Sequence, residues 1–190
     1  MENLTVTIFK DIKDIQSPHH ITLKTALERI RIGKSKSLIE RVRGTYSYNE
    51  KGESVPDKEA KRELPVVCFS GTFEARRDDA LISHNGLIVL DFDHIDVEES
   101  KTILATDDYV LACWVSPSGD GLKALVKIST PSKHREHFKA IQRYMDRTYG
   151  LEVDPSGKNE SRACFESYDE DIIINANSKT FSSIVSDTEE

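Results

Sequence analysis

The sequence predicts an α+β protein built around a split βαβ core. The prediction rests on apolar stretches of strand length, a helix-length segment between two of them, and a longer amphipathic helix that follows a strand hairpin. The order strand, helix, hairpin, helix, strand is typical of ferredoxin-like and RRM-like (RNA-recognition-motif-like) folds, in which one antiparallel sheet carries both helices on the same face. We therefore expect the opposite face of the sheet to be free for chemistry.

Residues 1–60 are expected to form an N-terminal unit with a strand, a helical hairpin and a flexible loop. Residues 5–9 alternate in the manner of a short strand. Apolar residues at helical spacing then predict two helices that end at Gly33 and Gly44. The apolar faces hold Leu23, Ala26, Leu27 and Ile30 in the first helix, and Leu38, Ile39 and Val42 in the second. Residues 46–63 are polar and lack apolar periodicity, which favours a flexible loop.

Residues 61–175 are expected to form the core. Its strands are predicted at residues 65–69, 86–90, 109–115 and 122–128, with a helix over 97–106. The longer helix begins after a Ser132 cap, buries Phe138, Ile141 and Met145, and ends at Gly150. Residues 172–174 form a last apolar triplet, and residues 176–190 are expected to be a frayed polar C-terminal tail.

Composition excludes several classes of protein. The chain has 190 residues, and 26 Lys and Arg against 33 Asp and Glu give a formal net charge of −7. This suits one globular domain with small appendages and argues against collagen, long disorder and a disulfide-dense scaffold. Net acidity also argues against a protein that coats duplex DNA, because such binding depends on Lys and Arg at the phosphates. A metal-assisted nucleotide site remains compatible with it.

Compartment is predicted from the apolar runs and the cysteines. The longest apolar runs are too short to span a bilayer, and the first residues lack a basic-then-apolar signal pattern. Cys68, Cys113 and Cys164 form no CxxC or Cys/His pattern, which favours reduced thiols in the core. We therefore expect a cytoplasmic protein that does not associate with a membrane.

The strongest local motif is an apolar strand, residues 86–90, that runs into Asp91 and Asp93. Side chains two apart on a strand point to the same side, roughly 6 to 7 Å from each other. That spacing suits divalent ions about 3.5 to 4 Å apart in a two-metal site. The alternative is structural: Asp91 ends a strand and Asp93 caps a turn.

A second motif, SPSGDGLK, occupies residues 116–123 between two predicted strands. Its glycines allow close approach of the backbone to a ligand, successive amides can form an anion-binding nest, and Lys123 adds a positive charge. The alternative is an ordinary hairpin loop. Further along, Asp154 is placed to complete a carboxylate cluster, and the Arg162 guanidinium suits a triphosphate. Taken singly, each such residue is more often a turn residue or an ion-pair partner.

The order DxD, glycine-rich basic loop, single Asp and Arg resembles the archaeo-eukaryotic primase, or primase-polymerase, superfamily. It is most similar to the VirE N-terminal-like branch on mobile elements of Bacteroidetes and their phages. The likeness rests on LDFDHI, SPSGDGLK and VDPSGKNESRACFESYD and covers roughly residues 64–174. One departure concerns Lys123, which stands where the wider superfamily usually has His; lysine attracts phosphate but cannot act as a neutral imidazole.

The resemblance implies a nucleotidyltransferase that uses two divalent ions, Mg²⁺ or Mn²⁺, for template-directed nucleotide transfer in replication of a mobile element or phage. Implied partners are nucleoside triphosphates, a single-stranded or primed DNA template, and a helicase domain or protein. The implied catalytic and metal-binding residues are Asp91, Asp93 and Asp154. The implied nucleotide-binding residues are Ser118, Gly119, Gly121, Lys123 and Arg162.

Two other readings of the sequence stay open. The first keeps the fold without catalysis, as a nucleotide- or DNA-binding module for replication or mobilisation. The second treats the DxD as the nucleophile and acid of a haloacid-dehalogenase-type phosphatase. It ranks last, because HIDVEE follows the DxD in place of a Gly-Thr-like turn and the SPSGDG hairpin breaks a parallel βαβ order.

Overall fold

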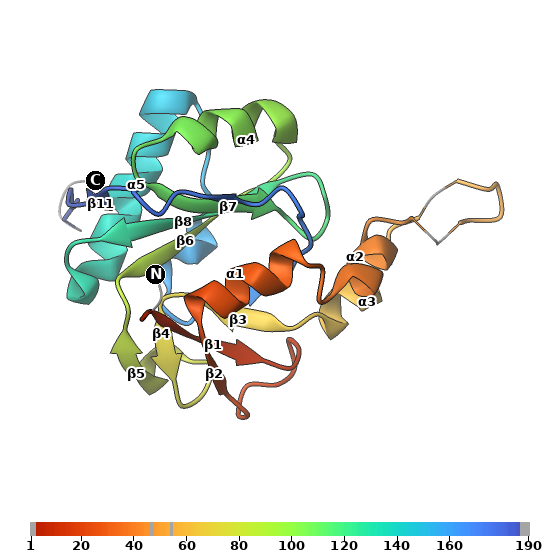
Figure 1. Cartoon of the computed structure of the whole chain (residues 1–190), viewed down its shortest axis with the longest axis horizontal. Coiled ribbons are helices and arrows are strands. Elements are labelled where there is room, and N and C mark those ends of the chain that lie inside the picture. The colour runs from red at the N-terminus through yellow and green to blue at the C-terminus, as the bar shows by residue number, and fades with distance from the viewer. Residues whose placement is uncertain (1–2, 46–47, 54, 187–190) are drawn as a thin grey trace.

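The computed structural model describes residues 3–45, 48–53 and 55–186, which form two β-sheets and the helices packed around them (Figure 1). Helices α4 (Val97–Thr106) and α5 (His134–Tyr149) cover one face of a five-stranded sheet. Helix α1 (Leu23–Arg31) lies on the other face, between that sheet and a four-stranded sheet. The α+β class is confirmed.

The five-stranded sheet contains the predicted split βαβ unit. Strand β8 (Leu122–Ile128) pairs antiparallel with β6 (Leu87–Phe92) and with β7 (Val110–Val115). Helix α4 connects β6 to β7, and α5 follows the β7–β8 hairpin. Both helices pack on the face that holds Leu90 and Phe92, which confirms the predicted placement of the two helices. Strand β10 (Ile173–Ile174) extends the sheet beside β7.

The expectation of a second face free for chemistry is wrong. Leu87 and Val89 of β6, together with Trp114 of β7 and Leu125 of β8, pack against α1 and the four-stranded sheet. That sheet has the order β2 (His19–Thr22), β1 (Thr5–Phe9), β3 (Val66–Cys68) and β9 (Cys164–Phe165). Apart from Asp91, Lys123 and Lys127, strands β6, β7 and β8 are apolar on both faces, and such strands are covered on both faces.

The N-terminal region and the core share this second sheet. Strand β1 pairs antiparallel with β3, and β3 pairs antiparallel with β9. An ion pair also links the two regions, since Arg29 Nε of α1 lies 2.5 Å from Oε1 of Glu166, which follows β9 directly. The Ser35 hydroxyl donates to the other oxygen of the same buried carboxylate. The four-stranded sheet is therefore built from residues distant in sequence.

Three local expectations need correction. Residues 58–63, assigned to the flexible loop, form helix α3 (Lys58–Glu63), because Asp57 caps it and Ala60 is buried in a cluster that includes Ile39 of α2 (Lys36–Val42). Ser132 does not cap α5; the N-cap is Lys133.

Part of the expected polar tail forms β11 (Thr180–Phe181), which pairs parallel with the end of β8. The hairpin of β4 (Gly71–Phe73) and β5 (Leu81–His84) was not predicted. Residues 46–47 and 54 of the expected loop, and 187–190 of the tail, lie outside the described residues.

In residues 3–45, 48–53 and 55–186, no helix is both long and apolar enough to cross a membrane.

The three cysteines are free and buried. Burial raises the pKa of the Cys68 and Cys113 thiols to about 12 and that of Cys164 to about 11. These side chains are therefore protonated thiols in the core at neutral pH.

A histidine pair joins β5 to α5. The His84 Nδ1 atom accepts a hydrogen bond from the Gly86 amide (2.9 Å), so the ring proton of neutral His84 lies on Nε2, 2.9 Å from Nδ1 of His134. Burial lowers the pKa of both rings to about 4, and the neighbouring His134 lowers that of His84 further. Both rings are therefore neutral in the folded protein at neutral pH.

This pair predicts loss of stability in mild acid. Unfolded histidines take up protons below about pH 6.5, whereas the folded pair does not until about pH 4. The contribution of this pair to the stability of the folded protein is therefore present above pH 6.5 and is lost as the pH drops toward 4. We expect the free energy of unfolding, measured with urea, to fall by about 4 kcal/mol between pH 7.5 and pH 5, about 2 kcal/mol for each histidine.

The His134→Gln variant should show a clearly smaller fall across the same pH range. The control is His94→Gln, because the His94 side chain is 85% exposed. An equally steep fall in wild type and His134→Gln would contradict this account of the pair.

Candidate functional site

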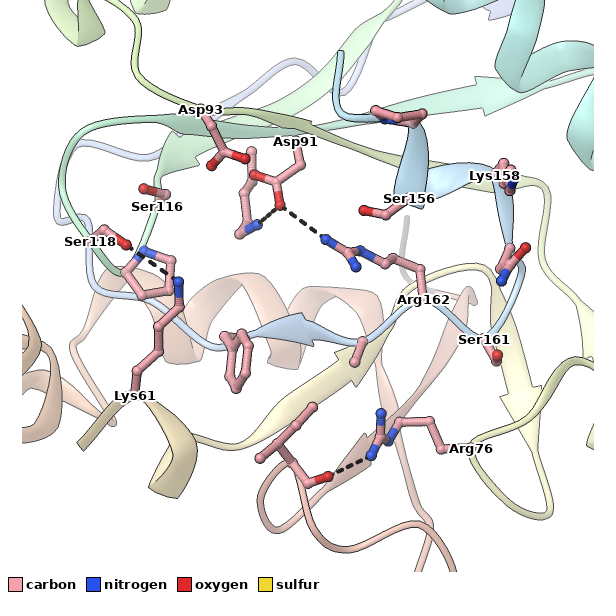
Figure 2. Close-up of a pocket in the computed structure, with 17 residues that line it drawn as sticks. Lys61, Arg76, Asp91, Asp93, Ser116, Ser118, Ser156, Lys158, Ser161 and Arg162 are labelled. Atoms are coloured by element: carbon pink, nitrogen blue, oxygen red, sulfur yellow. Dashed lines mark hydrogen bonds and ion pairs between the residues drawn. The ribbon is translucent and has the colours of Figure 1, made fainter. Parts of the chain in front are cut away.

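A cavity of about 750 Å³ lies where the end of β6 meets the four-stranded sheet (Figure 2). The end of β6, the β7–β8 loop, helix α3 and the segment from residue 155 to 165 contribute to its walls. Its polar lining is drawn from distant parts of the chain and comprises Lys61, Arg76, Asp91, Asp93, Ser116, Ser118, Lys123, Ser156, Lys158, Asn159, Ser161 and Arg162.

The centre of the cavity wall is a buried ion pair between β6 and β8. Asp91 and Lys123 are directly opposite each other in the antiparallel register, so their side chains emerge on the same face. Lys123 Nζ lies 2.5 Å from Asp91 Oδ2, and both side chains are nearly inaccessible to solvent. Arg162 Nη2 reaches the same oxygen at 3.5 Å. Two cations therefore compensate one buried carboxylate.

Asp93 lies on the same side of the strand as Asp91. Between them, Phe92 points into the core on the opposite face, so the strand alternation continues to the end of β6. Asp93 is exposed and lines the cavity, and Figure 2 shows its carboxylate beside that of Asp91. The structure thus brings together the two carboxylates of the DxD motif.

The β7–β8 loop contributes hydroxyl groups rather than glycines. The loop is closed by hydrogen bonds from Ser116 N to Gly121 O (2.9 Å) and from Gly119 N to Ser116 O (3.0 Å). Because the Gly119 amide is used inside the loop, it does not contribute to an anion-binding nest. Gly119 and Gly121 lie outside the cavity lining, whereas Ser116 and Ser118 line it.

The two glycines nevertheless shape the loop. Gly119 has φ +85°, which favours glycine, and a Cβ at Gly121 would lie 2.2 Å from Phe92 O. The chain therefore passes so close to the end of β6 that only glycine fits at position 121.

Asp154 does not line the cavity, so among the described residues it does not complete the expected carboxylate cluster with Asp91 and Asp93. Its amide donates to Asp91 O (2.9 Å), which places the backbone of residue 154 beside the DxD strand. Its carboxylate accepts from the Ser156 amide at 2.7 Å and from the Ser156 hydroxyl. The Ser156 hydroxyl lowers the pKa of Asp154; burial opposes this, while the positive Arg162 and Lys123 add to it. Ser156 itself lines the cavity, so Asp154 holds one wall in place.

Positive charge exceeds negative charge in the cavity. Among the described residues that line it, five are basic and two are acidic, in a chain whose net charge is −7. Sequence reasoning identified Lys123 and Arg162 but missed Lys61 and Lys158 and left Arg76 without a role. Lys158 lies within the recognised motif VDPSGKNESRACFESYD and was open to prediction. Lys61 lies on a helix that the sequence did not signal.

Three buried polar atoms of the cavity lining have no hydrogen-bond partner within the described part of the chain. They are Asp91 Oδ1, Ser116 Oγ and Arg76 Nε. Buried polar atoms are nearly always paired in folded proteins, because an unpaired one costs free energy. Their concentration in this one cavity indicates a polar ligand.

The aspartates fit a divalent ion only in a limited way. Across residues 3–45, 48–53 and 55–186, no group of three or more His, Cys, Asp and Glu side chains is arranged to hold a metal ion. Asp91 and Asp93 supply two carboxylates, and Oδ1 of Asp91 is unpaired. Because Mg²⁺ is commonly held by one or two carboxylates together with substrate phosphates, this donor set fits one ion shared with a phosphate ligand.

The last residues of the third motif, VDPSGKNESRACFESYD, hold the β7–β8 loop in place. The Ser167 hydroxyl donates to Val115 O (2.6 Å), and Asp169 accepts from the Val115 amide (2.9 Å). Asp169 is buried and is paired with Lys101 of α4 at 2.7 Å. Both residues fix the last residue of β7, directly before the SPSGDG loop. Their place in the motif is therefore explained by support of the site rather than by contact with a ligand.

The buried pair predicts strong coupling between Asp91 and Lys123. Removing one partner of a buried ion pair costs about 3–5 kcal/mol, since the other charge is left without compensation. We expect urea unfolding of Asp91→Ala and of Lys123→Ala to show losses near this range, with Asp91→Ala at the higher end because two cations then face each other. The double variant should lose less than the sum of the two.

The control for this cycle is the exposed pair of Asp120 and His94 on neighbouring loops. Asp120→Ala should change the free energy of unfolding by less than about 0.5 kcal/mol. Strictly additive losses for Asp91→Ala and Lys123→Ala would contradict the interaction.

Comparison with known proteins assigns the chain to a family. The model of the family described as "BT4734-like, N-terminal domain" matches residues 59–173. This span includes the DxD strand, the SPSGDG loop and the segment from Asp154 to Arg162. No curated protein and no solved structure matches the chain. Because the match covers more than half of the sequence, the chain belongs to the family of BT4734-like N-terminal domains.

Proposed function

We propose that the cavity binds a nucleoside triphosphate together with a divalent ion, Mg²⁺ or Mn²⁺, and that the domain is a primase-polymerase-like nucleotidyltransferase. The observation that carries the proposal is the lining itself, five cations and two strand-end aspartates among its described residues. The resemblance of the motifs to the primase-polymerase superfamily supports the type of reaction, template-directed nucleotide transfer on DNA in the replication of a mobile element or phage.

The charge pattern supports a polyphosphate ligand. Arg162 lies 3.5 Å from Asp91, a loose ion pair, and its side chain is about a third exposed. It is therefore free to turn its guanidinium toward a phosphate, which it can bind with two parallel hydrogen bonds. Lys61 and Lys158, on opposite walls, add positive charge at either side of such a ligand. Ser116 and Ser118 offer hydroxyl groups to the remaining phosphate oxygens.

The carboxylates take a separate role. Asp93 and the unpaired Oδ1 of Asp91 would hold the divalent ion beside the phosphates. Such an ion, when bound, neutralises phosphate charge and activates the attacking hydroxyl. Lys123 stays paired with Asp91 and compensates the charge of that buried carboxylate. We assign Asp154 to positioning Ser156 in the cavity wall.

A second candidate is a nucleotide-binding module without catalysis. It is favoured by the engagement of two of the three aspartates: Asp91 by Lys123 and Arg162, and Asp154 by Ser156. Such a module would serve replication or mobilisation beside a helicase. Both candidates require nucleotide binding, and they differ in whether labelled nucleotide is incorporated.

Incorporation of labelled nucleotide decides between the candidates. We expect the wild-type protein, with Mn²⁺ or Mg²⁺, to extend primed single-stranded DNA or to form dinucleotides from ribo- or deoxynucleoside triphosphates. Asp93→Asn should lose at least about a hundredfold in rate, because a ligand of the ion is removed. Since Asp93 is exposed, its folding should be unchanged.

The matched control is Asp120→Asn, an exposed aspartate on the adjacent loop that lies outside the lining. It should retain wild-type incorporation. Triphosphate binding without any product in wild type would select the non-catalytic module. Absence of both binding and product would overturn both candidates.

Lys158 offers a test of phosphate recognition that does not depend on catalysis. It is exposed and lines the cavity, so Lys158→Ala should leave the fold intact. We expect a loss of about three- to tenfold in triphosphate affinity by calorimetry, and a smaller loss at high salt because the contact is electrostatic. Lys133→Ala, an exposed lysine at the start of α5, should bind as wild type does. Equal affinities for the two variants would remove Lys158 from the site.

A further inference from the structure

Arg43 connects the N-terminal helices to the loop that lines the cavity. It is the C-cap residue of α2, and its guanidinium reaches across to the β7–β8 loop. Nη2 donates to Ser116 O and to Tyr168 O, both at 3.0 Å, and Nε donates to Pro117 O at 3.3 Å. One side chain thus holds main-chain carbonyls of the loop and of the segment after β9.

The surroundings of Arg43 are adapted to this contact. Its side chain is half-buried, and burial lowers its pKa while Asp169 and Tyr168 oppose that effect; an arginine nonetheless stays charged. A Cβ atom at Gly119 would lie 3.4 Å from Arg43 Nε, so the absence of a side chain there leaves room for the guanidinium. Arg43 itself does not line the cavity. Its influence on a ligand would therefore pass through the loop.

We propose that Arg43 is a positioning residue, which fixes the loop at residues 116–121 in the shape that presents Ser116 and Ser118 to the ligand. The part of this inference that concerns nucleotide binding rests on the proposed function. Arg43 lies outside the span 59–173 of the family match. The site thus needs a residue from the N-terminal segment for full affinity, although that segment contributes no part of the recognised motifs.

Hydrogen-bond geometry, rather than charge, is the basis of this role. The guanidinium is planar and presents several donors in a fixed fork, which matches carbonyl groups spread over two segments. A lysine at position 43 keeps the charge but not the fork. Arg43→Lys should therefore behave like Arg43→Ala, and this comparison separates positioning from a general electrostatic attraction for phosphate.

The test measures loop opening and ligand binding in full-length protein. Hydrogen exchange of the 116–122 segment reports the loop directly, because the Ser116 and Gly119 amides are hydrogen-bonded within it. Calorimetry with a nucleoside triphosphate and Mn²⁺ reports affinity. The variants are Arg43→Ala and Arg43→Lys. The matched control is Arg41→Ala, since Arg41 lies on the same helix but pairs with Asp57 and does not contact the loop.

We expect both Arg43 variants to raise loop exchange by about tenfold or more and to weaken triphosphate binding by about tenfold, with little dependence on salt. Arg41→Ala should match wild type in both. Wild-type loop exchange in Arg43→Ala, or full recovery in Arg43→Lys, would overturn the proposal. If wild type binds no triphosphate, the proposed function fails, while a rise in loop exchange in Arg43→Ala still supports the positioning role.

Discussion

The buried ion pair between Asp91 and Lys123 is the constraint on which the arrangement of the site depends. Asp91 sits in a strand that is buried on both faces, where an uncompensated carboxylate would be very costly. Lys123 on β8 lies directly opposite Asp91 in the strand register and compensates its charge. Any shift of β6 against β8 would separate the two charges, so the pair helps to fix the register of the sheet.

The same residue organises the walls of the cavity. The Asp91 carbonyl accepts the Asp154 amide, which places the turn with Ser156 and Lys158, and its carboxylate attracts Arg162 from the segment before β9. On the far side, Arg43, Ser167 and Asp169 hold the β7–β8 loop from behind. A ligand cavity with surplus positive charge thus lies around one buried negative charge, in a chain that is acidic as a whole.

Local patterns predicted much of the core, because strand alternation and helical spacing are properties of neighbouring residues. Helix α4 and strand β8 have the predicted bounds, and Asp91 and Asp93 emerge on one side as the alternation requires. The four-stranded sheet could not be predicted in the same way, since β3 and β9 each have only two or three residues and pair across long sequence separations. The doubly apolar strands β6 to β8 did carry a signal that both faces are covered.

The sequence predicted the site residues that lie on regular strands and missed those that tertiary packing brings to the site. The DxD strand and Lys123 lie on regular elements, so their side of the sheet follows from counting residues. Lys61 and Arg43 reach the site by tertiary packing of α2 and α3, and nothing in their own sequence neighbourhood signals it. Conversely, Gly119 and Gly121 serve the shape of the loop rather than the lining, a distinction that depends on contacts with Arg43 and Phe92 O.

The most direct measurement is the position of Mn²⁺ and a non-hydrolysable nucleoside triphosphate in crystals of the wild-type protein, with the ion located by anomalous scattering. The account predicts one anomalous peak between the carboxylates of Asp91 and Asp93, with the triphosphate against Arg162 and Lys158 and in contact with Ser116 or Ser118. A nucleotide bound outside this cavity, or an ion held without either of these two aspartates, would contradict it.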